Sequence, residues 1–180
     1  MMKSIQLTLL SILLTHLTVS GKIILPSVFS DNMVLQQNSR VAIWGWSIPG
    51  QTVKIISSWN SLDTIRATVN NSARWEAFIQ TSGAGGPYSI TITGTTSIQL
   101  NNVMLGEVWI CSGQSNMEMT FNWGIKNGEQ ELEKAENRNI RVFHIEKTAA
   151  DYPQLDCKAS WAESTPETIR ETSALAYFFA

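Results

Sequence analysis

Short runs in which apolar and polar residues alternate dominate the chain from about residue 22 to residue 102. Alternation with a period of two is typical of strands that bury one face, and turn residues separate these runs. The clearest run is Tyr88 to Thr93, which follows the turn-forming sequence Gly83 to Pro87. Short strands at this spacing predict an antiparallel β-sandwich domain over residues 22–102. The other runs that predict strands are 41–46, 52–57, 63–69, 75–80 and 97–100.

The pattern changes at residue 103. Residues 103–111 are almost wholly apolar apart from Glu107, which is typical of a strand covered on both faces. Residues 129–136 have a helical composition, and residues 140–145 predict a second strand. The second half of the chain therefore differs in kind from the first.

A helix start is predicted at Ser164, because Pro166 stands near the first helical position and Glu167 follows the serine by three residues. We expect this helix to run to Ala180. Strand, helix, strand and helix in this order predict the opening of a parallel α/β sheet over residues 103–180. Two strands are too few for a stable parallel sheet, and the last helix ends on an apolar face. We therefore expect a truncated chain, the N-terminal part of a longer protein.

The N-terminus has the composition of a secretory signal peptide. Lys3 supplies a positive charge, residues 5–17 are largely apolar, and Val19-Ser20-Gly21 offers small residues suited to cleavage. The apolar stretch is too short for a membrane span. We expect a signal peptide at residues 1–21, a mature protein that is secreted or periplasmic, and no membrane span after the signal is removed.

Composition narrows the function classes further. Of the 180 residues, 43% are hydrophobic and 16% are charged, as in a globular protein with a substantial core. The formal net charge of −2 gives no electrostatic basis for binding nucleic acid or an anionic membrane. Four of the seven tryptophans lie in the strand-rich stretch, where packing is favoured over a sugar-stacking surface. They are Trp44, Trp46, Trp59 and Trp75.

The cysteines and histidines give little sign of a metal site. Cys111 and Cys157 have no partner at metal-ligand spacing. A disulfide between them stays open, although we favour free thiols, with Cys111 as a small buried residue at the end of a strand. His144 is the only histidine left once the signal peptide is removed. It lies in an alternating stretch and is interpreted as structural.

The stretch Ser112-Gly113-Gln114-Ser115-Asn116 links the apolar run to a predicted helical turn at 117–119. A strand, a loop of small residues and a helix together expose a nucleophile at the carboxyl edge of an α/β sheet. Backbone N–H groups at the helix start can bind an oxyanion, with Gly113 allowing close approach and Gln114 and Asn116 as further donors. Because Met117 replaces the second glycine of G-x-S-x-G, the residues alone favour Ser115 as a helix N-cap over Ser115 as a nucleophile.

The block Trp109 to Glu118 resembles the nucleophile block of the sialate O-acetylesterase family, within the SGNH (GDSL-like) hydrolase superfamily. The resemblance implies Ser115 as the acyl nucleophile, with its own N–H in the oxyanion hole. The superfamily's Asp-x-x-His pair has no match in the sequence, so the catalytic base is expected outside this chain. Other segments that resemble the family are residues 25–36, 41–50, 85–88 and 174–180.

The resemblance implies an enzyme that removes O-acetyl groups from sialic acid or related sugars through an acetyl-enzyme intermediate. It implies an O-acetylated glycan as the substrate and neither a metal nor an organic cofactor. This chain is expected to be inactive alone, because the base is missing. Two other classes stay open: a non-catalytic glycan-binding β-sandwich with an inactive hydrolase remnant, and a secreted structural sandwich in which Ser115 is only a cap.

Overall fold

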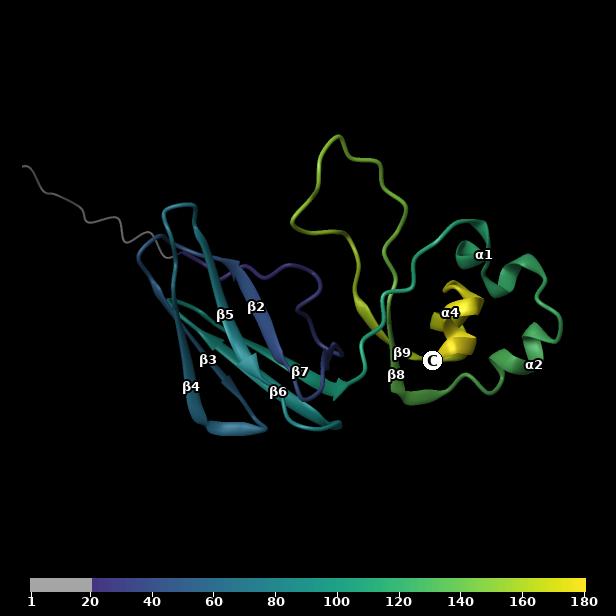
Figure 1. Cartoon of the computed structure of the whole chain (residues 1–180), viewed down its shortest axis with the longest axis horizontal. Helices are drawn as coiled ribbons and strands as arrows, with labels where there is room; N and C mark the ends of the chain where they lie inside the picture. Colours follow the sequence, from purple (N-terminus) through teal and green to yellow (C-terminus); the bar gives the residue numbers. More distant parts are fainter. Residues whose placement is uncertain (1–20) are drawn as a thin grey trace, which may run out of the picture.

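The computed structural model describes residues 21–180, so the predicted signal peptide lies outside the described residues except for Gly21. A five-stranded mixed sheet with the order β1-β7-β6-β3-β4 lies beside a two-stranded ribbon, β2–β5 (Figure 1). Neighbouring strands are antiparallel except that β1 runs parallel to β7. The strands are β1 (Val34–Gln36), β2 (Arg40–Trp46), β3 (Thr52–Ser57), β4 (Asn60–Thr68), β5 (Arg74–Gln80), β6 (Gly85–Thr93) and β7 (Ser97–Gly106).

Alternating side chains of the sheet and the ribbon meet in one core. Val53 and Ile55 of β3 are buried, as are Trp75 and Ile79 of β5, while the residues between them face outwards. Burying each large apolar side chain contributes about 1.5–3 kcal/mol, so the alternation fixes which face of each strand turns inwards. The strands predicted from this alternation are confirmed as β2 to β7, with shifted ends, and within the sheet and the ribbon only the short β1 was not predicted.

The apolar run from residue 103 to residue 111 is not one strand, so that prediction is wrong. Its first part completes β7, where Val103 and Leu105 are buried in the core of the first sheet. Beyond Gly106 the run leaves the sheet and has no regular structure up to Ser115, and Ile110 is 93% exposed. Sequence pattern shows that a segment suits a strand, but a strand also needs a neighbour for its backbone hydrogen bonds.

The last third of the chain forms a smaller unit around a second core (Figure 1). Its strands β8 and β9 form an antiparallel hairpin, which is the only sheet after Gly106 in the described residues. The second core contains Phe121, Leu132, Ile169 and Ala174. The elements are α1 (Ser115–Glu118), the 3-10 helix η1 (Phe121–Trp123), α2 (Gly128–Leu132), β8 (Asn137–Phe143), β9 (Trp161–Ser164), α3 (Pro166–Arg170) and α4 (Ala174–Phe179).

The fold is thus a mixed, curled sheet with few helices, and an antiparallel sandwich followed by the opening of a parallel α/β sheet is not confirmed. The predicted boundary between residues 102 and 103 falls inside β7. Asn102 has a positive φ of 54° at this point, and the β6–β7 register shifts nearby. This irregularity lets both Leu100 and Val103 turn inwards although they are three residues apart. Among residues 21–180, no helix is long and apolar enough to cross a membrane.

The predicted helix start near Pro166 is confirmed, but the helix is broken in two. Thr165 caps α3 by accepting a hydrogen bond from the N–H of Thr168, whose side chain accepts one from the N–H of Thr165. The cap is therefore Thr165 with Thr168, and not Ser164 with Glu167. Ser173 then caps α4 by accepting from the N–H of Ala176, so residues 171–173 interrupt the predicted helix.

Candidate functional site

Ser115 is the first residue of α1, and it is exposed together with the whole preceding loop 107–114. Gln114 occupies the N-cap position, where its backbone oxygen accepts hydrogen bonds from the N–H groups of Met117 and Glu118, at 2.9 and 3.1 Å. The alternative in which Ser115 is the cap is therefore wrong, since the cap is one residue earlier. The hydroxyl of Ser115 forms no hydrogen bond with any described residue.

Backbone N–H groups at the start of α1 are available to a ligand. The first N–H groups of a helix have no acceptor inside the helix, and within residues 21–180 none is supplied to Ser115 or Asn116. Because α1 has only four residues, its macrodipole is small, and the individual N–H groups matter more. Backbone donors of this kind stabilise the negative charge that develops on a carbonyl oxygen during acyl transfer.

Gly113 has a steric role in this loop. A Cβ atom at this position would lie 3.1 Å from the Cβ of Met117, which is tighter than ordinary contacts. Glycine therefore lets the loop fold back closely against the first turn of α1. The side chains of Gln114 and Asn116 are exposed beside Ser115 and form no hydrogen bonds with the described residues.

Helix α4 holds α1 from one side. The Ser173 hydroxyl lies 3.3 Å from the sulfur of Met117, and the N–H of Ala174 donates to the oxygen of Met119 at 2.9 Å. Trp109 packs edge-on against Phe179, with 5.1 Å between ring centroids. These contacts fix the turn that carries Ser115. In the sequence, the apolar character of residues 174–179 is the one signal that indicates such contacts.

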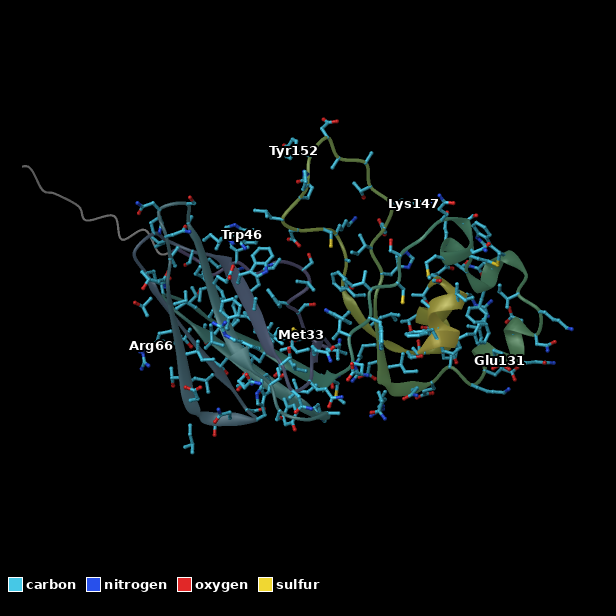
Figure 2. The ribbon with its side chains drawn as sticks, in the orientation of Figure 1. Met33, Trp46, Arg66, Glu131, Lys147 and Tyr152 are labelled. Carbon is cyan, nitrogen blue, oxygen red and sulfur yellow. The ribbon has the colours of Figure 1, made fainter. Side chains whose placement is uncertain are left out.

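Two further contacts anchor the segment around Ser115. Lys147 Nζ contacts the carboxylate of Glu118, so the loop that follows β8 reaches α1 (Figure 2). At the other end, the side chains of Gln36 and Gln37 donate to Glu107 at 3.0 and 2.8 Å. These hydrogen bonds lower the pKa of the Glu107 carboxyl group below its ordinary value. The loop 107–114 is therefore tethered to β1 where it begins.

His144 and Cys111 differ from their predicted environments. His144 lies just beyond β8 and is exposed, so its interpretation as a structural residue of a strand is wrong. Cys111 is exposed instead of buried, because the strand predicted around it does not form. Both Cys111 and Cys157 are free thiols. Among residues 21–180, no group of three or more metal-binding side chains converges.

The chemistry that this arrangement supports is limited and specific. An exposed hydroxyl lies beside unpaired backbone donors, a glycine that permits close approach, and two amide side chains. That combination suits a nucleophile attacking a carbonyl group. No imidazole or carboxylate in the described residues is hydrogen-bonded to Ser115, so the site has no base in hydrogen-bond contact with the serine.

Comparison with known proteins gives a consistent set of relatives. No family model matches the chain. A sialate O-acetylesterase from Pongo abelii is 31% identical over 157 residues, which cover 79% of this chain and 30% of the relative. The sialate O-acetylesterase from Mus musculus is also 31% identical, over 77% of this chain and 28% of the relative. The chain thus spans about 30% of the length of the curated relatives.

A solved structure supports the same relationship. The crystal structure of a carbohydrate acetylesterase from Xanthomonas citri matches 88% of this chain and 36% of its own chain, with a TM-score of 0.82 and 28% identity. Because the match covers both the mixed sheet and the smaller unit, the way these two parts are joined is shared with that enzyme.

Proposed function

Since the chain belongs to the sialate O-acetylesterase family, we propose that it carries the nucleophile of a carbohydrate esterase. Its substrates are O-acetyl esters of sialic acid or related sugars. The observation that carries the proposal is Ser115, exposed at the start of a helical turn beside unpaired N–H groups. The non-catalytic alternative is not favoured, because the relatives in sequence and structure are esterases.

In the proposed reaction, the Oγ of Ser115 attacks the acetyl carbonyl carbon and its proton passes to a base. The tetrahedral oxyanion is bound by the N–H of Ser115, with Gly113, Gln114 and Asn116 lining its surroundings. Expulsion of the sugar hydroxyl leaves an acetyl-enzyme, and water then releases acetate. Because no described side chain is hydrogen-bonded to Ser115, the chain by itself is expected to hydrolyse esters slowly.

The remaining features of the proposal concern location and architecture. The apolar N-terminus with Lys3 supports a signal peptide and a secreted or periplasmic protein. The division into a β-sandwich and an SGNH-like α/β esterase domain is proposed for the complete enzyme. Neither a metal nor an organic cofactor is required by the serine mechanism.

A chimera tests the nucleophile. This chain would replace the matching 36% of the Xanthomonas citri acetylesterase, and acetate release from an aryl acetate would be measured. Replacing Ser115 with Ala should lower turnover by about 10⁶-fold, the usual loss for a triad nucleophile. The matched control is Ser112→Ala, three residues earlier in the same exposed loop, which should stay within tenfold of the parent chimera.

Full turnover in the Ser115→Ala chimera would overturn the assignment. A chimera that does not fold would be replaced by the isolated chain mixed with the remainder of the Xanthomonas citri enzyme. Either format gives the same comparison between the two serine variants.

A further inference from the structure

The backbone of the segment before α1 has no partner strand. Within residues 21–180, the N–H and C=O groups of residues 109–113 form no hydrogen bond, and these residues are exposed. Val108, Trp109 and Ile110 nevertheless belong to the β-branched and aromatic types that favour strands. Unpaired backbone with this composition is a template for pairing with another extended segment.

The mixed sheet holds the beginning of this segment in a fixed place. The side chain of Gln36 in β1 donates to Glu107 at 3.0 Å and accepts from the N–H of Val108 at 2.9 Å. The chain then crosses from β7 to α1 (Figure 1). Because α4 holds α1 at the other end, the unpaired backbone lies between two anchored ends.

Apolar side chains of α4 adjoin the same segment. The rings of Trp109 and Phe179 are in edge-on contact. Leu175 and Phe179 are four residues apart in α4, so they lie on one side of this helix. We call residues 108–111 together with Leu175, Phe178 and Phe179 the open apolar face. Five of its side chains are each more than half exposed, namely Trp109, Ile110, Leu175, Phe178 and Phe179.

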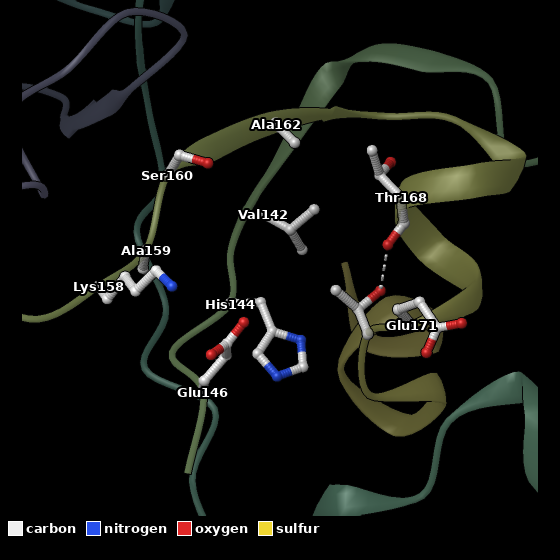
Figure 3. Close-up of a pocket in the computed structure, with 10 residues that line it drawn as sticks. Val142, His144, Glu146, Lys158, Ala159, Ser160, Ala162, Thr168 and Glu171 are labelled. Carbon is white, nitrogen blue, oxygen red and sulfur yellow. Dashed lines mark hydrogen bonds between the residues drawn. The ribbon is translucent and has the colours of Figure 1, made fainter. Parts of the chain in front are cut away.

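A second open surface of the smaller unit has a different character. A hollow of about 660 Å³ lies between the β8–β9 hairpin and α3 (Figure 3). Its lining combines Val142 and Ala162 with the charged side chains of Glu146, Lys158 and Glu171. Charged groups are stabilised by water, so water can occupy this hollow at little cost in free energy. The open apolar face has no charged member, and only contact with another surface removes it from water.

The relatives contain polypeptide that can supply such a surface. This chain matches 36% of the Xanthomonas citri acetylesterase and 30% of the Pongo abelii sialate O-acetylesterase. Each of these proteins therefore has a larger part to which this chain has no counterpart. An exposed apolar cluster of this kind marks a site of contact between proteins or between parts of one protein.

An extended segment suits the open apolar face better than a helix. A helix forms its backbone hydrogen bonds internally. It could cover the apolar side chains, but the backbone of residues 109–111 would stay unpaired. A strand supplies N–H and C=O partners, and every second side chain of that strand can cover the apolar side chains.

We propose that the open apolar face binds an extended apolar segment from the part of an acetylesterase that this chain does not match. Residues 108–111 pair with that segment as a strand. The identity of the partner rests on the proposed esterase function. Pairing places Ser115 shortly after a fixed strand, whereas in the chain alone it follows a loop without backbone hydrogen bonds. Docking of the partner therefore orders the approach to the nucleophile.

Hydrogen–deuterium exchange followed by mass spectrometry tests the proposal without any turnover. The chimera described above is compared with the isolated chain at low micromolar concentration. A peptide spanning residues 108–113 is expected to exchange at least tenfold more slowly in the chimera, because paired amides exchange only when the strand opens. Peptides from β5 should exchange alike in both proteins, which shows that the mixed sheet is folded in each.

Two results would overturn the proposal. The first is exchange at residues 108–113 that is not slowed in a folded chimera. Where the chimera does not fold, the same result with the isolated chain and the rest of the Xanthomonas citri enzyme mixed together counts equally. The second is equally slow exchange in the isolated chain, which would assign the open apolar face to a second copy of this chain.

Ile110→Pro tests whether backbone pairing is responsible for the protection. Proline removes the N–H of residue 110 and does not fit inside a sheet, so the slowing should fall below twofold. Ile110→Val is the matched control, since it keeps the N–H and a branched side chain, and it should retain at least fivefold slowing. Because Ile110 is exposed and unpaired in the isolated chain, neither variant should change the Tm of that chain. Tenfold slowing in the Ile110→Pro chimera would contradict the pairing.

The outcome is distinct from that of the esterase test. Protection at residues 108–113 without hydrolysis would remove the esterase proposal and leave the docking face. Hydrolysis that depends on Ser115 without protection there would do the reverse.

Discussion

Gly45 lies in β2 on the face that packs into the main core, between Trp44 and Trp46. A Cβ atom there would be 2.4 Å from the backbone oxygen of Ile24 and 3.1 Å from the ring of Trp75. Ile24 and Trp46 exchange two backbone hydrogen bonds, at 3.0 and 2.9 Å, so the backbone at Ile24 is held in place. Because Gly45 has only a hydrogen atom as its side chain, the backbone at Ile24 can pack directly against β2.

Replacing Gly45 with Ala should lower the free energy of unfolding by about 1–3 kcal/mol, since overpacking forces backbone movement. The measurement is urea unfolding followed by tryptophan fluorescence, with the slope of the transition unchanged. Gly83→Ala is the control, because a Cβ there would be 4.0 Å from the nearest atom, the side-chain oxygen of Asn38. Equal stability of the two variants would contradict the steric argument.

Among the elements, the β8–β9 hairpin is joined to the mixed sheet by a polar cluster. Arg141 of β8 has a side chain only 2% exposed, 3.3 Å from Glu163 of β9. Asn102 of β7 donates to Glu163 at 2.7 Å and accepts from Arg141 at 3.3 Å. Burial lowers the pKa of the Arg141 guanidinium, and the neighbouring Glu163 carboxylate opposes that effect. The cluster compensates a buried charge at the junction of two elements.

Replacing Glu163 with Gln should lower the free energy of unfolding by about 2 kcal/mol. Breaking a fully buried ion pair typically costs about 3–5 kcal/mol, and the Glu163 side chain is 31% exposed, which reduces the loss. The control is Arg138→Gln, because Arg138 is 84% exposed at 4.0 Å from the same carboxylate and should contribute less than about 0.5 kcal/mol. Thermal unfolding of both variants measures the difference, and an unchanged Glu163→Gln stability would refute it.

At the scale of the whole molecule, apolar side chains gather around α4 and the loop before α1. Trp109 is 64% exposed although it packs against Phe179, which is itself 59% exposed. Ile110 and Leu175 are 93% and 52% exposed. Soluble monomers rarely expose such a cluster, and apolar surface of this kind promotes association.

The purified chain is therefore expected to self-associate as its concentration rises from micromolar to millimolar. Light scattering coupled to size-exclusion chromatography gives the mass at each concentration. Ile110→Ser with Phe179→Ser should reduce the association at least fivefold. Leu62→Ser is the control, because Leu62 is 98% exposed but lies on β4, away from this cluster. A concentration-independent mass for the parent chain would rule the expectation out.

The local pattern of the sequence determined where most strands lie and which of their faces turn inwards. Alternation in β3 and β5 specified their inward faces. A strand that buries one face is stabilised by apolar residues at every second position, whichever strands lie beside it. The helix start near Pro166 was likewise predictable, since a cap is made by residues a few positions apart, although the cap is Thr165 and not the predicted Ser164. The small-residue loop before Ser115 left a nucleophile open, although the residues alone favoured a helix cap and only the family resemblance implied the nucleophile.

Tertiary structure decided what local pattern cannot contain. Residues 107–111 have the composition of a strand but stay outside the sheets, because strand pairing depends on a partner strand that can come from any part of the fold. Three features depend on residues that are distant from one another in the chain. They are the break in the last predicted helix, the hollow between β8–β9 and α3, and the Arg141–Glu163–Asn102 cluster. Their energies come from packing and burial between elements, so only the folded arrangement of the described residues specifies them.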